Sequence, residues 1–215
     1  GQLWYDSTNK DFKYQYPNVT SAGSWATSAT LNTARADLGG GGIYTSALAF
    51  GGDKPPGRTG ETESFGGTSW TEVNDMGTAR RFPGSTGSSN TNAIAFGGDS
   101  GTKYGNTESW NGSNWTEVND LNTTRTQLAG SGASNTSALA FGGDDGSVRA
   151  YTESWNGTNW TEVNDLNQAR SLIAGTGITT STLAFGGYDG SSRTTKTESW
   201  NGTNWTEVND LNVTR

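Results

Sequence analysis

The twelve residues NGTNWTEVNDLN stand at positions 156–167 and again, unchanged, at 201–212, while NGSNWTEVNDLN stands at 111–122. A catalytic segment is normally needed once, so a stretch that recurs in this way indicates an architectural unit. The tryptophans of the stretch follow one another at steps of 45 residues: Trp70, Trp115, Trp160 and Trp205. The sequence therefore predicts a tandem-repeat protein with this period.

Three further markers keep the same phase along the chain. They are an arginine, the tetrapeptide AFGG and the tripeptide TES followed by an aromatic residue, and the arginines are Arg35, Arg80, Arg125, Arg170 and Arg215. We therefore divide the chain into an N-terminal extension or partial blade at 1–34 and a repeat region at 35–215. The repeat region holds four units, at 35–80, 81–125, 126–170 and 171–215.

The composition indicates an ordered β protein. Apolar residues make up only 30% of the chain, but 11% is aromatic, only 16% is charged, and the aromatic residues recur in phase, as core positions would. Thr, Asn and 32 glycines suit short strands joined by tight turns. No apolar run approaches the ~18 residues that span a membrane, so we expect no membrane insertion. The lack of an initial Met and of a signal peptide suggests a processed or excised chain.

Two residue types are absent, and their absence limits the possible chemistry. Without Cys and His the chain has no disulfides, no thiolate or imidazole metal ligands and no histidine acid–base catalysis. We expect no metal and no cofactor. The net charge of −7 argues against general binding of nucleic acid, which needs a basic surface.

One unit, residues 126–170, contains four candidate strands. TQLAGSG and the compact apolar run TSALAFGG form the first two, and DDGSVRAY is a polar loop with a turn signal. TESW and WTEVNDL form the third and fourth strands, joined by the hairpin turn NGTN. Four antiparallel strands in about 45 residues are typical of one blade of a β-propeller.

This pattern resembles the kelch repeat. The resemblance rests on an Arg, a hydrophobic strand that ends in Gly–Gly, a strand with an aromatic residue and a Trp shortly after it; here these are Arg125, Gly142–Gly143, Trp155 and Trp160. It recurs in all four units, with Phe65 in place of the third-strand Trp in the first. The resemblance implies an all-β, kelch-like propeller of four-stranded antiparallel blades. It implies little about function, because the family includes enzymes, cytoskeletal proteins and adaptors.

The first 34 residues are the irregular part of the chain. GSWATSATLNTAR at 23–35 matches a fourth strand, and FKYQYP at 12–17 suits a third strand. Two arrangements stay open: a five-bladed ring cut short, or four blades with the N-terminus packed as an extension. GQLWYDSTNKDFKY at 1–14 also resembles short hairpins of bacteriophage tail-fibre and other phage structural proteins.

The repeated Trp and Arg residues are expected to serve the architecture. Trp115, Trp160 and Trp205 suit contacts between neighbouring blades better than a sugar-stacking platform, since packing requires the same residue in every blade. The arginines are expected to tie one blade to the next by bonding a carbonyl group or an acid, such as Glu108, Glu153 or Glu198.

The units differ most between Gly–Gly and TES, where they read DKPPGRTGE, DSGTKYGN, DDGSVRAY and YDGSSRTTK. These loops between strands two and three should emerge beside the links to the next blades, and loops on a rigid scaffold often carry binding sites. The alternative is relaxed selection on solvated loops. The candidate ligand-binding residues are the basic and aromatic ones in these loops: Lys54, Arg58, Lys103, Tyr104, Arg149, Tyr151, Tyr188, Arg193 and Lys196.

The hypothesis from sequence is a non-enzymatic recognition or structural module, outside the cell or on a virion, that binds a glycan or a protein on a cell surface. An enzyme like the kelch-fold copper oxidases would need His and Cys, which are missing, and no acid stands out from the repeats for carboxylate catalysis. The alternatives are a structural spacer in a fibre and an intracellular adaptor. Membership of a larger chain or a homo-oligomer stays open.

Overall fold

The computed structural model describes residues 2–6, 11–15 and 28–215, and these residues form strands, turns and loops without any helix. In this part of the chain, accordingly, no helix is long and apolar enough to cross a membrane. The all-β class that the sequence predicts is confirmed.

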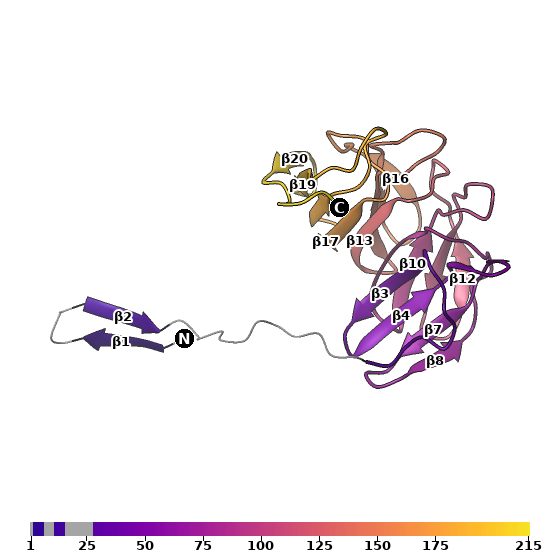
Figure 1. The fold of residues 1–215 in the computed structure, drawn as a ribbon, viewed down its shortest axis with the longest axis horizontal. Helices are drawn as coiled ribbons and strands as arrows, with labels where there is room; N and C mark the ends of the chain where they lie inside the picture. The colour runs from indigo at the N-terminus through magenta and orange to yellow at the C-terminus, as the bar shows by residue number, and fades with distance from the viewer. Residues whose placement is uncertain (1, 7–10, 16–27) are drawn as a thin grey trace.

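Each unit contributes one four-stranded antiparallel sheet, and the sheets follow one another in chain order (Figure 1). We number them one to four. Sheet one holds β3 (Gly39–Ile43), β4 (Ser46–Phe50), β7 (Thr62–Phe65) and β8 (Trp70–Val73), and sheet two holds β9 (Gly84–Ser89), β10 (Asn92–Phe96), β11 (Thr107–Trp110) and β12 (Trp115–Val118). Sheet three holds β13 (Ala129–Ser134), β14 (Ser137–Phe141), β15 (Thr152–Trp155) and β16 (Trp160–Val163). Sheet four holds β17 (Ala174–Ile178), β18 (Ser181–Phe185), β19 (Thr197–Trp200) and β20 (Trp205–Val208).

Two small antiparallel pairs complete the secondary structure. The first, β1 (Gln2–Asp6) with β2 (Asp11–Gln15), includes the start of the predicted FKYQYP strand, whose observed partner is β1. Of the fourth strand predicted at 23–35, residues 23–27 lie outside the described residues, and residues 28–35 form no strand. The second pair, β5 (Asp53–Lys54) with β6 (Gly57–Arg58), shapes the loop between the second and third strands of sheet one.

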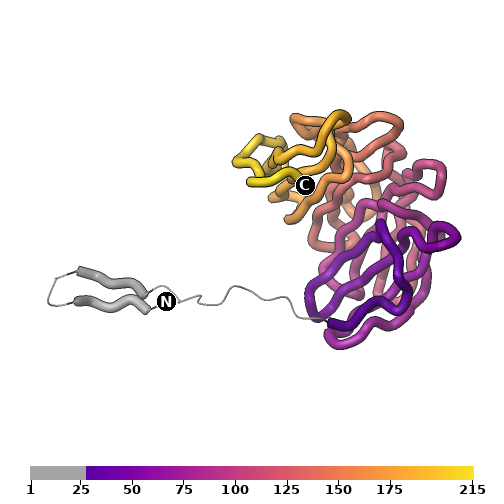
Figure 2. The backbone as a smooth tube through the Cα atoms, viewed as in Figure 1, coloured from indigo at the N-terminus to yellow at the C-terminus, as the bar shows by residue number. Residues whose placement is uncertain are grey.

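The first strands of the sheets lie side by side, β3 with β9, β9 with β13 and β13 with β17. Glycine allows this close approach: a Cβ atom on Gly130 would lie 2.4 Å from the carbonyl oxygen of Ser85. All four first strands border one hollow of about 290 Å³. No comparable contact joins β17 to β3 among the described residues, so the row of sheets in Figure 2 has two free ends.

The core lies between the sheets, where an aromatic residue from one sheet meets a Trp from the next. Phe96 of β10 packs edge to face on Trp160 of β16, with ring centroids 4.8 Å apart. The indole Nε1 of Trp160 donates a hydrogen bond to Thr107 Oγ1 on β11, 3.0 Å away. The same pair of contacts recurs at the other two junctions, where Trp115 is half-buried and Trp205 is buried. The predicted packing of these Trp residues between units is therefore confirmed.

A buried arginine binds two successive sheets at each junction. The carbonyl oxygen of Arg80 accepts a hydrogen bond from Gly52 N of sheet one (2.8 Å). Its guanidinium group donates to Gly97 O of sheet two (3.2 Å) and pairs with Glu108 (2.8 Å). Arg170 repeats this arrangement with Gly186 and Glu198, while Arg125 pairs with Glu153 and donates to Ala140 O. The predicted arginine ties are confirmed.

The glutamate partners also hold the links between sheets. Glu153 accepts hydrogen bonds from the backbone N and the Nδ2 of Asn122, at 2.7 and 2.8 Å, while Arg125 lies 3.1 Å from its other oxygen. Glu153 and Arg125 are both almost fully buried. Each Arg–Glu pair therefore fixes the link as well as the next sheet.

Trp160→Ala should lower the free energy of unfolding by about 3–5 kcal/mol, because it removes a large buried aromatic side chain at a junction. Trp160→Phe, which keeps a ring but loses the bond to Thr107, should cost less. Urea denaturation followed by circular dichroism would measure both. An alanine variant with unchanged stability would contradict the packing role.

Glu153→Gln should lower the free energy of unfolding by about 3–5 kcal/mol, because it leaves the Arg125 guanidinium buried without its counter-charge. The matched control is Glu162→Gln: Glu162 faces Glu153 across the β15–β16 pair but is exposed, so its replacement should have little effect. Equal losses in the two variants would show that the buried pair has no special role.

Candidate functional site

The loops between the second and third strands share one end of the sheets with the links between sheets. Isolated β-bridges join Ala36 to Asp53, Arg81 to Asp99, Thr126 to Asp144 and Ser171 to Tyr188. We call this end the loop face; it comprises residues 36–38, 53–61, 81–83, 99–106, 126–128, 144–151, 171–173 and 188–196. The sequence predicted this shared end, because the loop and the link both follow strands that run in the same direction.

Four residues in left-handed conformation lie at the centre of the loop face: Asp37, Phe82, Gln127 and Leu172, with φ of 56°, 50°, 59° and 51°. We call them the central quartet. Non-glycine residues in this conformation cost about 1–2 kcal/mol each. A chain of backbone hydrogen bonds supports them: Phe82 N donates to Asp37 O, Gln127 N to Phe82 O, and Leu172 N to Gln127 O, at 2.8, 3.2 and 2.8 Å.

The central quartet borders a recess at the loop-face end of the four first strands. Together with Leu38, Pro83, Leu128 and Ile173, it lines a cavity of about 230 Å³. The four side chains are an acid, a phenyl ring, an amide and an aliphatic group, although the backbone is the same at each position. A fixed backbone with four different side chains is an arrangement suited to recognition of one asymmetric ligand.

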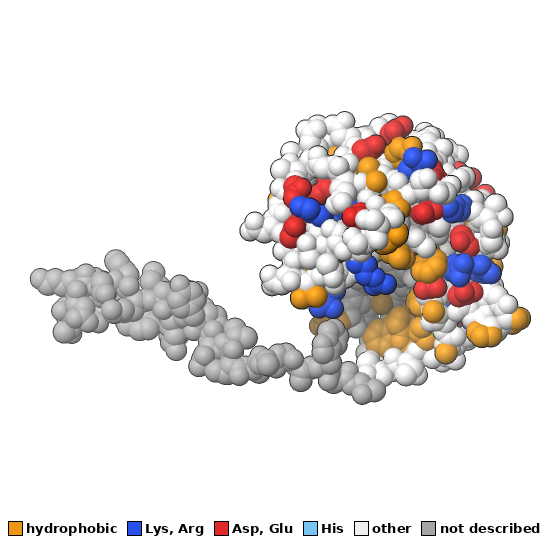
Figure 3. Space-filling view, turned by 45° about the horizontal axis from the view of Figure 1, so that its top comes forward, with side chains coloured by type: hydrophobic (Ala, Val, Ile, Leu, Met, Phe, Trp, Pro, Cys, Tyr) orange, Lys and Arg blue, Asp and Glu red, His pale blue; other side chains and the backbone are white. Residues whose placement is uncertain are grey.

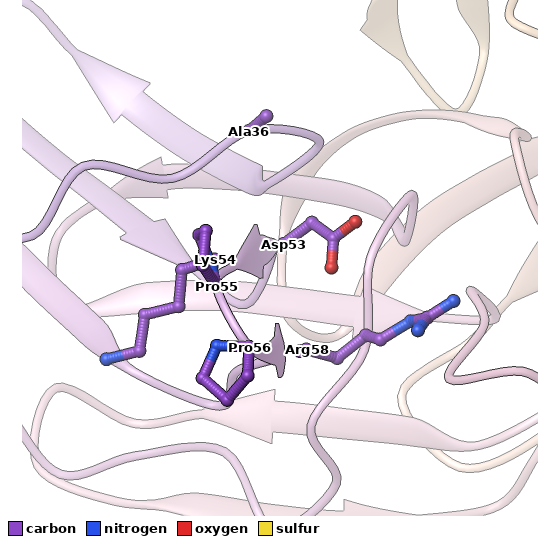
Figure 4. Close-up of a pocket in the computed structure, with 7 residues that line it drawn as sticks. Ala36, Asp53, Lys54, Pro55, Pro56 and Arg58 are labelled. Atoms are coloured by element: carbon purple, nitrogen blue, oxygen red, sulfur yellow. The ribbon is translucent and has the colours of Figure 1, made fainter.

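Lys54 and Arg58 lie in the loop of sheet one, beside a recess of about 460 Å³ that is lined by Ala36 and residues 53–58 (Figure 4). The two side chains point in opposite directions. Lys54 pairs with Glu61, while Arg58 reaches across to Asp99 in the loop of sheet two, at 3.7 Å. They therefore do not converge on one ligand position.

Ion pairs join neighbouring loops at the first two junctions. Lys103 of sheet two pairs with Asp144 of sheet three, as Arg58 pairs with Asp99. Arg81, in the link, lies 3.2 Å from Asp53 and 3.6 Å from Asp99. These cations hold adjacent loops together, so their charges are largely compensated by the protein itself.

The loop of sheet three is bonded differently because Tyr188 occupies the position of Asp53, Asp99 and Asp144 in sheet four. Arg149 Nε donates to Asp145 Oδ2 within the same loop, at 2.8 Å, and its guanidinium lies 5.4 Å from the Tyr151 ring centroid. The hydrogen bond from Arg149 holds the pKa of Asp145 below its usual value. Asp145 therefore stays ionised and paired to lower pH than an ordinary aspartate.

The remaining candidates are Tyr104, Lys196, Tyr188 and Arg193. The hydroxyl groups of Tyr104 and Ser100 are hydrogen-bonded to each other, and Lys196 pairs with Glu207 and Asp210 of its own unit. Tyr188 and Arg193 line a recess of about 240 Å³ together with Leu172 and Arg215. Within residues 28–215, Arg193 makes no ion pair, so it differs from most of the other basic candidates.

The loop face therefore carries mixed charge rather than a basic patch. In Figure 3 most basic side chains on the visible face lie beside acidic ones. The structure brings Tyr188 and Arg193 together with Leu172 of the central quartet, and it keeps Lys54 and Lys196 engaged elsewhere. Local contacts with a ligand, rather than a long-range electrostatic field, are what this face provides.

Sequence reasoning did not identify the central quartet or the role of Arg81. Left-handed positions are usually signalled by glycine, and here none of the four is glycine. The signal that was present is variation in phase: the second residue after each repeat arginine is Asp, Phe, Gln and Leu in turn.

No protein-family model matches this chain, and no curated protein matches it.

Gln127→Gly should leave the stability nearly unchanged, because relief of the left-handed strain offsets the extra entropy of glycine in the unfolded chain. Gln127→Val should destabilise by more than about 1 kcal/mol, since a β-branched side chain tolerates positive φ poorly. Thermal unfolding of the two variants beside the parent would test this. Strong destabilisation by Gly would mean that the Gln side chain serves folding.

Proposed function

We propose that the chain is a kelch-like β-propeller module without enzymatic activity, which recognises a glycan on a cell surface through the loop face. The propeller is supported by the four sheets in sequence and by the hollow that all four first strands border. The module would act outside the cell or on a virion, where near-identical repeats commonly carry a varied binding face.

The observation that carries the proposal is the variation on the loop face, where the units differ most from one another. The Trp, Arg and Glu residues at the junctions repeat with little change. On the loop face, equivalent positions hold different side chains, in the central quartet and in the four loops. The backbone conformation does not depend on these side chains, because it is similar at each of the four quartet positions.

The chemistry of the central recess favours a sugar. Asp37 and Gln127 offer acceptors and donors for hydroxyl groups, and Phe82 offers an apolar ring that suits a sugar face. Beside them, Arg193 offers a guanidinium group for a carboxylate or sulfate, with Tyr188 next to it. The proposed ligand is therefore an acidic glycan. Single contacts would be weak, and several copies on one surface would add avidity.

A glycan array and binding to whole cells would test the function, with the labelled parent chain and two variants. Arg193→Ser and the double variant Phe82→Gly with Gln127→Gly should each weaken attachment about tenfold, equivalent to about 1.4 kcal/mol. The control is Thr158→Ala, in the exposed hairpin turn at the opposite end of sheet three, which should bind like the parent.

Circular dichroism should confirm that each variant keeps the fold. If the parent binds no glycan and no cell, or if folded variants attach as well as the parent does, recognition through the loop face is wrong. The chain would then be better explained as a structural spacer.

A further inference from the structure

The outer surface of sheet four lacks the cover that its counterparts have. Leu183 of β18 is 41% exposed, whereas the equivalent Leu139 of β14 is fully buried against sheet four. Leu172 and Val208 are likewise exposed in this unit. We call this surface the open face.

At two of the three internal junctions, an apolar residue of the following unit packs into a recess on the sheet before it. Leu128 packs against Phe96 and Leu121 of sheet two, and Ile173 packs against Phe141 and Leu166 of sheet three. On sheet four the corresponding recess is a cavity of about 280 Å³, lined by residues that include Ala174, Phe185, Leu211 and Arg215. Its size and its lining suit a further aliphatic side chain.

The open face also carries polar groups whose equivalents bind the next sheet. Arg170 pairs with Glu198 and Arg58 pairs with Asp99, while their counterparts Arg215 and Arg193 make no ion pair within residues 28–215. Thr152 Oγ1 accepts a hydrogen bond from Trp205, as its counterparts in sheets one and two accept from Trp residues.

Thr197 is the counterpart of Thr152 in sheet four, and in the same part of the chain its Oγ1 accepts no such bond. The open face thus presents a recess for an aliphatic side chain, two guanidinium groups and one hydroxyl acceptor, in the arrangement that an internal junction uses.

From this match we propose that the open face seats a further four-stranded unit of the same repeat, joined to the chain after Arg215. The unit would supply an aliphatic side chain for the recess, a strand with small alanines over Leu183, a glutamate for Arg215, an aspartate for Arg193 and a Trp for Thr197. The inference does not rest on the proposed glycan binding.

Sheet one does not fit this place, either from the same chain or from a second copy. Its glutamate, Glu63, already pairs with Arg35 at 3.1 Å and accepts hydrogen bonds from Asn32 at 2.7 and 2.9 Å. Arg215 would therefore find no free carboxylate there. In a unit joined after Arg215, no other arginine would pair with the glutamate. Arg215 itself is the last residue of the link before that unit.

The test extends the full chain by a second copy of residues 126–170, which carries Asp144, Glu153 and Trp160, placed directly after Arg215. If the added unit docks on the open face, the extended chain should unfold in one transition, with a melting temperature at least about 5 °C above that of the parent. No increase, or a separate transition at lower temperature, would overturn the proposal.

Leu183→Asp in both chains locates the contact. In the parent, where Leu183 is exposed, the melting temperature should change little; in the extended chain, the substitution should abolish the increase. The matched control is Ile43→Asp, at an exposed apolar residue of sheet one, which should shift both chains equally. Equal effects of Leu183→Asp in the two chains would place the added unit elsewhere.

Light scattering of the parent chain completes the experiment. A monomer at all concentrations is expected. A parent dimer that Leu183→Asp dissociates would show that a second copy, not a further unit, covers the open face, and would overturn the proposal.

Discussion

The fold depends on the buried arginine at the end of each unit, because this residue belongs to two sheets at once. The backbone of Arg125 is bonded to sheet two through Gly98, and its guanidinium group lies in sheet three beside Glu153. Burial lowers the pKa of Arg80, Arg125 and Arg170, but a guanidinium group stays charged at neutral pH. Removing such a charge from water costs about as much as the pair returns, so the pair acts mainly by allowing only one placement of the next sheet.

This placement determines what the loop face can do. The first strands approach one another so closely that glycine is needed at their contacts. The left-handed residues of the central quartet lie in the chain just before these strands. The hydrogen bonds that connect the quartet from sheet to sheet use only backbone atoms. The side chains are therefore free to differ without any change in the scaffold, and a surface with four independent side chains on one rigid support results.

The sequence was sufficient for the parts that repeat and insufficient for the parts that do not. The four strands of each unit, the Trp contacts and the Arg–Glu pairs could be predicted, because each must satisfy the same packing and charge requirements in every unit. The partners of Lys103 and Arg149 could not be predicted. Whether a loop cation pairs within its own loop or with the next loop depends on the first residue of that next loop. Tyr188 in place of an aspartate changes that choice for Arg149. The conformation of Gln127 also has no local signal, because the bond to Phe82 comes from a neighbouring sheet.

The binding face and the stacking of sheets are physically coupled. Arg58 and Lys103 extend from one loop to the aspartate of the next, so the spacing between loops is set by the same junctions that hold the core. In a row of units that contact only their neighbours, stability is the sum of the unit and junction contributions, and the units at the ends are the least supported. Sheet four has one packed surface, and its loop contains Tyr188 and Arg193, which makes no ion pair within residues 28–215. A further unit on the open face would therefore do two things at once: it would stabilise sheet four, and it would engage Arg193 in a pair between loops. Recognition of an acidic group would then fall to the loop of the unit that follows, because the central quartet holds no basic side chain.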